Sequence, residues 1–239
     1  MTRTYVLCHA HPDDETLATG ALALALAARG DVVHVLTATR GEQGEVRPGP
    51  YEALQGTAEL AVIRERELAD AVAALKLAGH TYLGSPPARA AGMQPRRYTD
   101  SGMRWVTPTL AGPGDDAGPD SLTEAEATEV AADIAAFARA VSATDLVSYD
   151  DDGGYGHPDH IRMHHATRAA AEALALPFHV IVTNADGPYD EWLDATSDTE
   201  ALERAYDAYD TQFIRTGDDI VHVGGQADRV VRAAGLRRV

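Results

Sequence analysis

Short apolar runs alternate along this chain with longer segments of helical periodicity. Runs of strand length lie at residues 4–10, 32–38, 80–83, 145–149 and 178–182, and a further short strand is expected near 220–223. Helical segments are expected at residues 16–29, 51–77, 121–141, 158–175 and 197–210. Strands that alternate with helices predict an α/β fold, a Rossmann-like and mostly parallel sheet with helices on both faces.

Two signals place helix boundaries within this pattern. Gly30 follows the first helical segment and suits a glycine C-cap. Ser121 and Glu124 have the spacing of a capping box, which predicts that a helix begins near Ser121.

The size of the chain allows one sizeable core, because 45% of its 239 residues are hydrophobic. With no internal repeat and no clear linker, residues 1–239 are interpreted as a single domain. Residues 85–119 are rich in Gly, Pro and Arg and lack periodicity, which predicts a long active-site loop. Residues 180–239 would form a smaller C-terminal part.

Two polar clusters directly follow predicted strands. The first polar cluster, residues 11–15 (HPDDE), follows the strand at 4–10, and the second, residues 153–160 (GGYGHPDH), follows the strand at 145–149. Ligands of parallel sheets bind beyond the C-terminal ends of the strands, near a switch in strand order. Both clusters are therefore expected at the same edge of the fold.

The residue types in these clusters suit a divalent metal. His11 and Asp14 are three residues apart and can converge on one ion, and His157 and His160 have the same spacing. Nitrogen and oxygen donors together favour zinc or another divalent first-row metal. Three such ligands with a water, and a carboxylate nearby to accept its proton, are typical of hydrolysis.

Each cluster alone has a structural explanation. The HPDD sequence could cap a helix N-terminus, and HPDH could be a surface turn. Their joint occurrence at two strand ends favours the metal site. His9 could line that site without binding metal, and His164 could be a ligand or a neighbour of one.

Charge and cysteine content limit the partners and the compartment. The chain carries 37 acidic and 20 basic residues, a formal net charge of −17, which opposes binding to nucleic acid or to an anionic membrane surface. Cys8 is the only cysteine, so no intrachain disulfide can form. The N-terminal apolar run is too short for a signal peptide, which predicts a cytoplasmic protein. The sequence is compatible with a homo-oligomer.

The two clusters resemble the PIG-L/LmbE-like deacetylases, zinc enzymes that remove acetyl groups from N-acetylglucosamine conjugates. The resemblance runs from VLCHAHPDDETLATGALALALAARGDVVHVLTATRGEQGEV at residues 6–46, through RERE at 64–67, YLG at 82–84 and DSGM at 100–103, to the second cluster. It covers most of residues 4–170. It implies one Zn²⁺ per chain, with Fe²⁺ as an alternative.

Residue by residue, the resemblance implies three kinds of role. His11, Asp14 and His160 would be the metal ligands. Among the catalytic residues, Asp13 would be the general base, and His157 would stabilise the oxyanion or protonate the leaving amine. Asp159 would orient His157, and Tyr155 would help to polarise the substrate carbonyl. Arg64 and Asp100 would hold sugar hydroxyls.

The predicted function is thus the metal-dependent hydrolysis of a linear amide, an N-acyl group on an N-acetylglucosamine-type small molecule. The sequences GGYGHPDH and DSGM most resemble the mycothiol-pathway branch, so an amidase of mycothiol-type S-conjugates is the alternative. A nucleotide-binding module is disfavoured, because no GxGxxG or GxxxxGK pattern follows the first strand. A zinc-binding protein without hydrolase activity is disfavoured by the presence of both Asp13 and His157.

Overall fold

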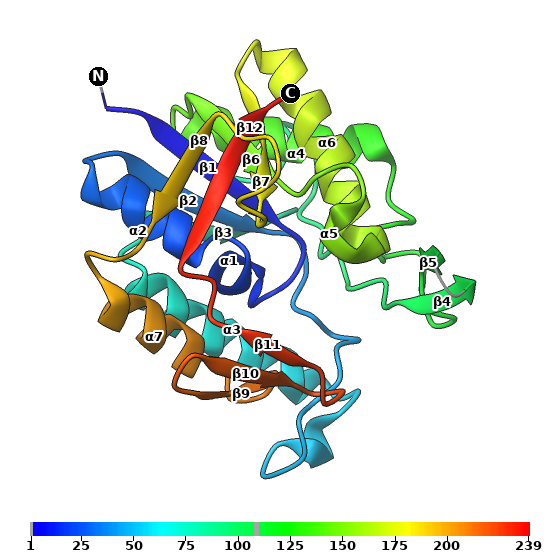
Figure 1. Cartoon of the computed structure of the whole chain (residues 1–239). Coiled ribbons are helices and arrows are strands. Elements are labelled where there is room, and N and C mark those ends of the chain that lie inside the picture. Colours follow the sequence, from blue (N-terminus) through cyan, green and yellow to red (C-terminus); the bar gives the residue numbers. More distant parts are fainter. Residues whose placement is uncertain (1, 108–109) are drawn as a thin grey trace.

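The computed structural model describes residues 2–107 and 110–239 (Figure 1). The strands of the main sheet are β1 (Thr4–His9), β2 (Val32–Thr37), β3 (Gly79–Tyr82), β6 (Asp145–Ser148), β7 (Phe178–Val182), β8 (Glu191–Asp194) and β12 (Ala233–Arg238). The helices are α1 (Asp14–Leu17), α2 (Gly20–Ala28), η1 (Glu52–Leu54, a 3₁₀ turn), α3 (Ala58–Ala74), α4 (Ala127–Ala140), α5 (Gly153–Gly156), α6 (Pro158–Leu174) and α7 (Thr199–Asp207).

The main sheet of the described residues has seven strands in the order β3-β2-β1-β6-β7-β12-β8. The pairs from β3 to β7 are parallel, whereas β12 runs antiparallel to both β7 and β8. From β1 the chain builds outward to β2 and β3, and it returns to the other side of β1 with β6. The C-terminal ends of β1 and β6 therefore flank the switch in strand order, where such sheets bind ligands.

Alternate residues of β1 pack against helices on opposite faces of the sheet. Val6 and Cys8 belong to the apolar cluster that includes residues of α4 and α6. Tyr5 and Leu7 belong to a second cluster with Leu22 of α2. Figure 1 shows α2 on one side of the sheet and α4 and α6 on the other. The predicted α/β fold, with helices on both faces of a mostly parallel sheet, is confirmed.

Three helix boundaries differ from the prediction. The first predicted helix is divided into α1 and α2, and the second begins at Ala58 instead of residue 51. The capping box at Ser121 was wrong, because α4 begins only at Ala127. Ser121 instead bridges to Thr99, and its hydroxyl donates to the carbonyl oxygen of Gly118.

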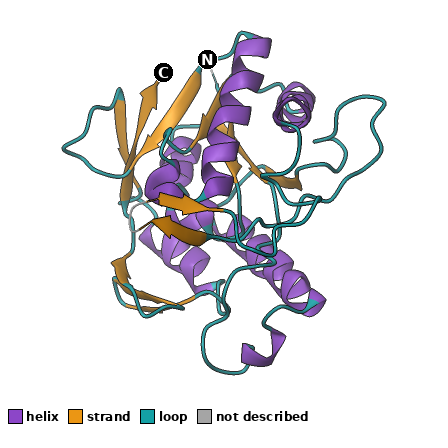
Figure 2. Cartoon of the chain, turned by 90° about the vertical axis from the view of Figure 1, so that its right-hand side faces the viewer, coloured by secondary structure: helices purple, strands orange, loops and turns teal. Residues whose placement is uncertain are grey.

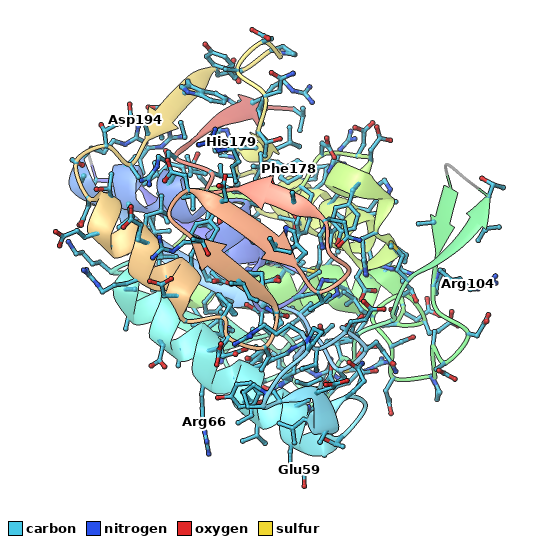
Figure 3. The ribbon with its side chains drawn as sticks, turned by 60° about the horizontal axis from the view of Figure 1, so that its bottom comes forward. Glu59, Arg66, Arg104, Phe178, His179 and Asp194 are labelled. Atoms are coloured by element: carbon cyan, nitrogen blue, oxygen red, sulfur yellow. The ribbon has the colours of Figure 1, made fainter. Side chains whose placement is uncertain are left out.

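The predicted loop at residues 85–119 contains a hairpin of β4 (Arg104–Thr107) and β5 (Leu110–Gly112). Residues 108 and 109 of this loop lie outside the described residues. In Figure 2 the hairpin lies at the front of the view, and Figure 3 shows it at Arg104, extending away from the body of the protein.

The C-terminal part contains more strands than the prediction gave. β9 (Phe213–Thr216), β10 (Asp219–His222) and β11 (Ala227–Arg229) form a separate antiparallel sheet beside α7, and of these only β10 was expected. β8 and β12 extend the main sheet. α3 packs against α7, and Glu59 and Arg66 point outward from it (Figure 3).

Among the described residues, no helix combines the length and the apolar character that crossing a membrane requires.

Candidate metal centre and active site

The first polar cluster forms the turn between β1 and α1. β1 ends at His9, and α1 begins at Asp14. Between them, Asp13 has φ 106° and ψ −30°, a left-handed conformation that costs a non-glycine residue about 1–3 kcal/mol. The N–H groups of Thr16 and Leu17 donate to its carbonyl oxygen at 2.9 and 2.8 Å. The turn thus holds a strained acidic residue at the strand end.

The second polar cluster is shaped by glycine and proline. Gly153 has φ 66°, and a Cβ atom there would lie 2.9 Å from the Cβ of His160, so the close approach requires glycine. Pro158 occupies the first turn of α6, as predicted. His157 is the N-cap of this helix, and its side chain accepts the N–H of Asp159. The segment therefore places His157 and His160 at the start of one helix.

His11 and His160 face each other, and each ring uses one nitrogen in a hydrogen bond to another group. His160 Nδ1 donates to the carbonyl oxygen of Gly153 at 3.1 Å, and His11 Nε2 donates to the carboxylate of Asp159 at 3.1 Å. Each neutral ring then carries its lone pair on the other nitrogen. These nitrogens, His11 Nδ1 and His160 Nε2, are 3.3 Å apart. Two nitrogens at this distance can be bridged by a proton or by a metal ion.

The carboxylate of Asp14 completes a set of three donors. It lies 3.5 Å from His11 Nδ1 and 3.3 Å from His160 Nε2. Two ligands that are each about 2.05 Å from a tetrahedral zinc ion are about 3.3 Å apart. The two distances involve different oxygens, Oδ2 toward His11 and Oδ1 toward His160, so the carboxylate lies beside both nitrogens at separations close to those of ligands around one small divalent cation.

His157 lies beside these donors. His11, His157 and His160 form a largely buried group whose ring nitrogens are within 4.8 Å of one another in the described structure. Burial, together with His11 and His160, lowers the pKa of His157 to about 3. Its Nδ1 accepts the backbone N–H of Asp159 at 3.2 Å, so the neutral ring carries its proton on Nε2. His157 is thus a hydrogen-bond donor at the centre.

Asp159 contacts both histidines, but differently from the prediction. Its backbone N–H orients His157, whereas its carboxylate oxygen Oδ2 accepts from His11 and from the N–H of Ser101 at 2.9 Å. A carboxylate that fixes the second nitrogen of a metal-binding imidazole is a common feature of metal sites. Its other oxygen, Oδ1, is buried and has no hydrogen-bond partner within residues 2–107 and 110–239.

Arg64 and Asp100 lie at the site, and both form hydrogen bonds to the backbone, although Arg64 Nε is buried without a partner among the described residues. Arg64 is 1% exposed, and its guanidinium donates to the carbonyl oxygens of Gly41, Gly44 and Glu45. The Asp100 carboxylate accepts the N–H groups of Gln43 and Gly102 and lies 3.5 Å from His11 Nε2. Both side chains therefore stabilise the loops that line the site. That they also bind sugar hydroxyls stays a prediction.

Tyr155 is the exposed member of the site. Its side chain is 58% exposed, and its ring lies edge-on to His160 with centroids 5.1 Å apart. Gly154 and Gly156 on either side both have positive φ angles. Glycines at these positions leave the backbone free to move the ring over the histidines.

Tyr149 is a residue of the site that the sequence analysis did not single out. Its hydroxyl donates to Asp14 Oδ2 and accepts the N–H of Ala10, both at 2.7 Å. Its ring stacks on His160, with centroids 4.0 Å apart and an interplanar angle of 8°. The sequence did offer a signal for Tyr149, because it is an aromatic residue at the end of a buried strand and shortly before the second polar cluster.

The electrostatics of the centre favour a cation. Burial acts to lower the pKa of His11, yet the surrounding carboxylates, with that of Asp100 first, raise it well above its usual value. Burial and the neighbouring Asp14 and Glu15 raise the pKa of Asp13 well above its usual value. A metal ion would replace the proton on His11 and would favour ionised Asp13.

The fold and the site together define a metal-binding α/β protein whose donors meet at the switch in strand order. The sequence model of one family, PIG-L: GlcNAc-PI de-N-acetylase, matches residues 6–171. The chain therefore belongs to this family, which confirms the resemblance of its motifs.

Relatives with curated names support this membership. The chain is 46% identical over 165 residues to the 1D-myo-inositol 2-acetamido-2-deoxy-alpha-D-glucopyranoside deacetylase of Kineococcus radiotolerans, a match that covers 69% of this chain and 44% of the relative. It is 39% identical over 202 residues to deacetylase 1 of the same name from Saccharopolyspora erythraea, covering 82% and 63%. The chain thus matches less than two thirds of the length of each relative.

A solved structure shares the fold over the whole chain. The deacetylase–teicoplanin complex of teicoplanin biosynthesis aligns with a TM-score of 0.61 at 18% identity, over 99% of this chain and 98% of that one. At this identity, the likeness concerns the fold alone.

Proposed function

We propose that this protein is a metal-dependent N-deacetylase that acts on an N-acetylglucosamine-type small molecule. The observation that carries the proposal is the meeting of His11 Nδ1, His160 Nε2 and the Asp14 carboxylate at separations of 3.3–3.5 Å. These three residues are the proposed ligands. His157 is disfavoured as a ligand, because its proton lies on the nitrogen that would have to bind the metal.

Two nitrogen donors and one carboxylate fit zinc best and also suit Fe²⁺. A divalent cation held here would supply Lewis acidity to the amide carbonyl and to the attacking water. With three protein ligands, room remains for water and substrate, as catalytic sites of this kind require.

The chain's own residues would divide the remaining chemistry. Asp13, which directly precedes the proposed ligand Asp14, accepts the proton of the attacking water. The Nε2–H of His157 donates a hydrogen bond to the oxygen that becomes negative during attack, and the proton that Asp13 has accepted is available for the leaving amine. Tyr155 closes over the substrate carbonyl, and Arg64 and Asp100 complete the sugar-facing wall.

The names of the relatives suggest the substrate. Both relatives described above are named deacetylases of an N-acetylglucosaminyl-inositol. We therefore propose that this compound, or a close analogue with another aglycone, is deacetylated here. The alternative substrate is the amide of a mycothiol-type S-conjugate.

The test is acetate release by purified protein, first stripped with a chelator and then loaded with Zn²⁺ or Fe²⁺. N-acetylglucosaminyl-inositol and an S-conjugate amide are compared as substrates. We expect metal-dependent acetate release and a loss of about 10²–10⁴-fold in kcat for Asp13→Asn that still binds metal. Near-normal turnover of metal-loaded Asp13→Asn would contradict the proposed mechanism, and preferential cleavage of the S-conjugate would overturn the proposed substrate.

A further inference from the structure

We propose that residues 209–212 (YDTQ), here called the anchor segment, position the general base Asp13 from the C-terminal part of the chain. This inference rests on the proposed function, in which Asp13 is the base. The anchor segment follows α7 and lies outside residues 6–171, which the family match covers.

The peptide group between Pro12 and Asp13 is held at both of its polar atoms. The side-chain amide of Gln212 donates to the carbonyl oxygen of Pro12 at 2.8 Å. On the other side, the N–H of Asp13 donates to Glu15 Oε2 at 3.2 Å. Tyr209 donates in turn to Glu15 Oε1 at 2.6 Å. One contact from the anchor segment is thus direct, and the other passes through Glu15.

This arrangement determines the backbone angle of Asp13. The orientation of the Pro12–Asp13 peptide relative to α1 sets φ of Asp13, which is 106°. Without external hydrogen bonds, a non-glycine residue would relax toward negative φ and release about 1–3 kcal/mol of strain. Such a relaxation would change the direction in which the Asp13 side chain leaves the turn next to the proposed ligand Asp14. Gln212 and Tyr209 oppose it.

The anchor segment is itself fixed to the rest of the fold. Thr211 makes two hydrogen bonds to the Glu67 carboxylate on α3, both 2.7 Å long. Arg47 donates to the carboxylate and the backbone carbonyl oxygen of Asp210. Tyr209, Thr211 and Glu67 are buried. A segment fixed in this way can keep Asp13 in its strained conformation, although the two are far apart in the sequence.

The experiment compares two buried tyrosines near each other in the chain. Tyr209→Phe removes one of the two hydroxyls that donate to Glu15 Oε1, and the hydroxyl of Thr16 remains. Tyr206→Phe removes a hydroxyl whose hydrogen bond within the described structure is the one accepted from the N–H of Val231. Each tyrosine is 1% exposed, so the loss of stability should be comparable. The second positioning contact is tested with Gln212→Leu, alone and together with Tyr209→Phe. All variants are studied in the full-length, metal-loaded protein.

We expect Tyr209→Phe with Gln212→Leu to lower kcat by roughly 10- to 100-fold, because small displacements of a catalytic group have effects of this size. KM and metal affinity should stay within about twofold of wild type, since the ligands and the substrate wall are untouched. Amide hydrogen exchange of residues 11–16 should accelerate in this variant and not in Tyr206→Phe.

Equal kcat values in wild type and the double variant would overturn the inference. So would an equal loss of kcat in Tyr206→Phe, since the effect would then follow general destabilisation. These outcomes are separate from a failure of the proposed function, which active Asp13→Asn would reveal.

Discussion

The hydroxyl of Tyr149 forms hydrogen bonds to the backbone just before the first polar cluster and to Asp14, a proposed metal ligand. The variant Tyr149→Phe tests what these contacts contribute. Phenylalanine preserves the ring that stacks on His160 at 4.0 Å. It removes the 2.7 Å hydrogen bond to the Asp14 carboxylate and leaves the buried N–H of Ala10 without its acceptor.

The magnitude follows from these two losses. A hydrogen bond to a charged group contributes about 1.5–3 kcal/mol, and an unsatisfied buried N–H costs about 1–3 kcal/mol. Partners that orient metal ligands typically change metal affinity by about 10- to 100-fold, or roughly 1.4–2.8 kcal/mol. We therefore expect Tyr149→Phe to unfold more easily and to bind Zn²⁺ about 10- to 100-fold more weakly.

Competition with a chromophoric chelator measures the metal Kd, and denaturant unfolding of the metal-free protein measures stability. The matched control is Tyr98→Phe, since Tyr98 is also fully buried and its hydroxyl donates to the Asp133 carboxylate at 2.9 Å. The control should lose stability and keep its metal Kd. If Tyr149→Phe also kept the wild-type Kd, Asp14 would not depend on this contact, and the reasoning would be refuted.

Two further predictions concern the second cluster and the edge of the sheet. Gly153→Ala should reduce both stability and metal affinity, because its Cβ would lie 2.9 Å from His160 Cβ. Gly154→Ala should reduce stability alone, because Gly154 has φ 77° but no described atom would lie within 4 Å of its Cβ. Chelator competition measures the metal affinity of both variants, and denaturant unfolding measures their stability. Burial, with a contribution from Arg40, lowers the pKa of His80 to about 4, below the value of about 6.5 in the unfolded chain. The unfolded chain therefore takes up this proton first, so the contribution of His80 is present above about pH 6.5 and is lost as pH falls toward 4. Between pH 7 and 5 the wild type should lose about 1–2 kcal/mol more than His80→Gln in denaturant titrations, and parallel pH profiles would contradict this assignment.

The five parallel strands of the main sheet (β1, β2, β3, β6 and β7) and the convergence of the two clusters could be predicted because their signals are local. Buried parallel strands appear as short apolar runs, and a polar cluster after such a run must lie at the C-terminal edge of the sheet. The residues 11–14 and 157–160 also carry donor types that few structural roles require together. Which nitrogen of each histidine faces the centre depends on Gly153 and Asp159, and this detail needs coordinates.

The C-terminal strands and the anchor contacts could not be predicted from local patterns. β12, with the sequence AAGLRR, has little strand propensity of its own, and it is a strand because it pairs with β7 and β8. Glu15 and Tyr209 are 194 residues apart, and Pro12 and Gln212 are 200 apart. No periodicity or spacing rule joins residues so distant in the chain.

The position of β12 between β7 and β8 also limits how proteins of this fold can be recombined. A chimaera joined just after β7 would receive a foreign strand into the interior of its principal sheet, with hydrogen-bonded neighbours on both sides. Exchange of C-terminal parts to alter specificity therefore has to preserve the length and register of that strand. Grafts confined to the β4–β5 hairpin avoid this constraint, because those two strands pair only with each other in the described structure.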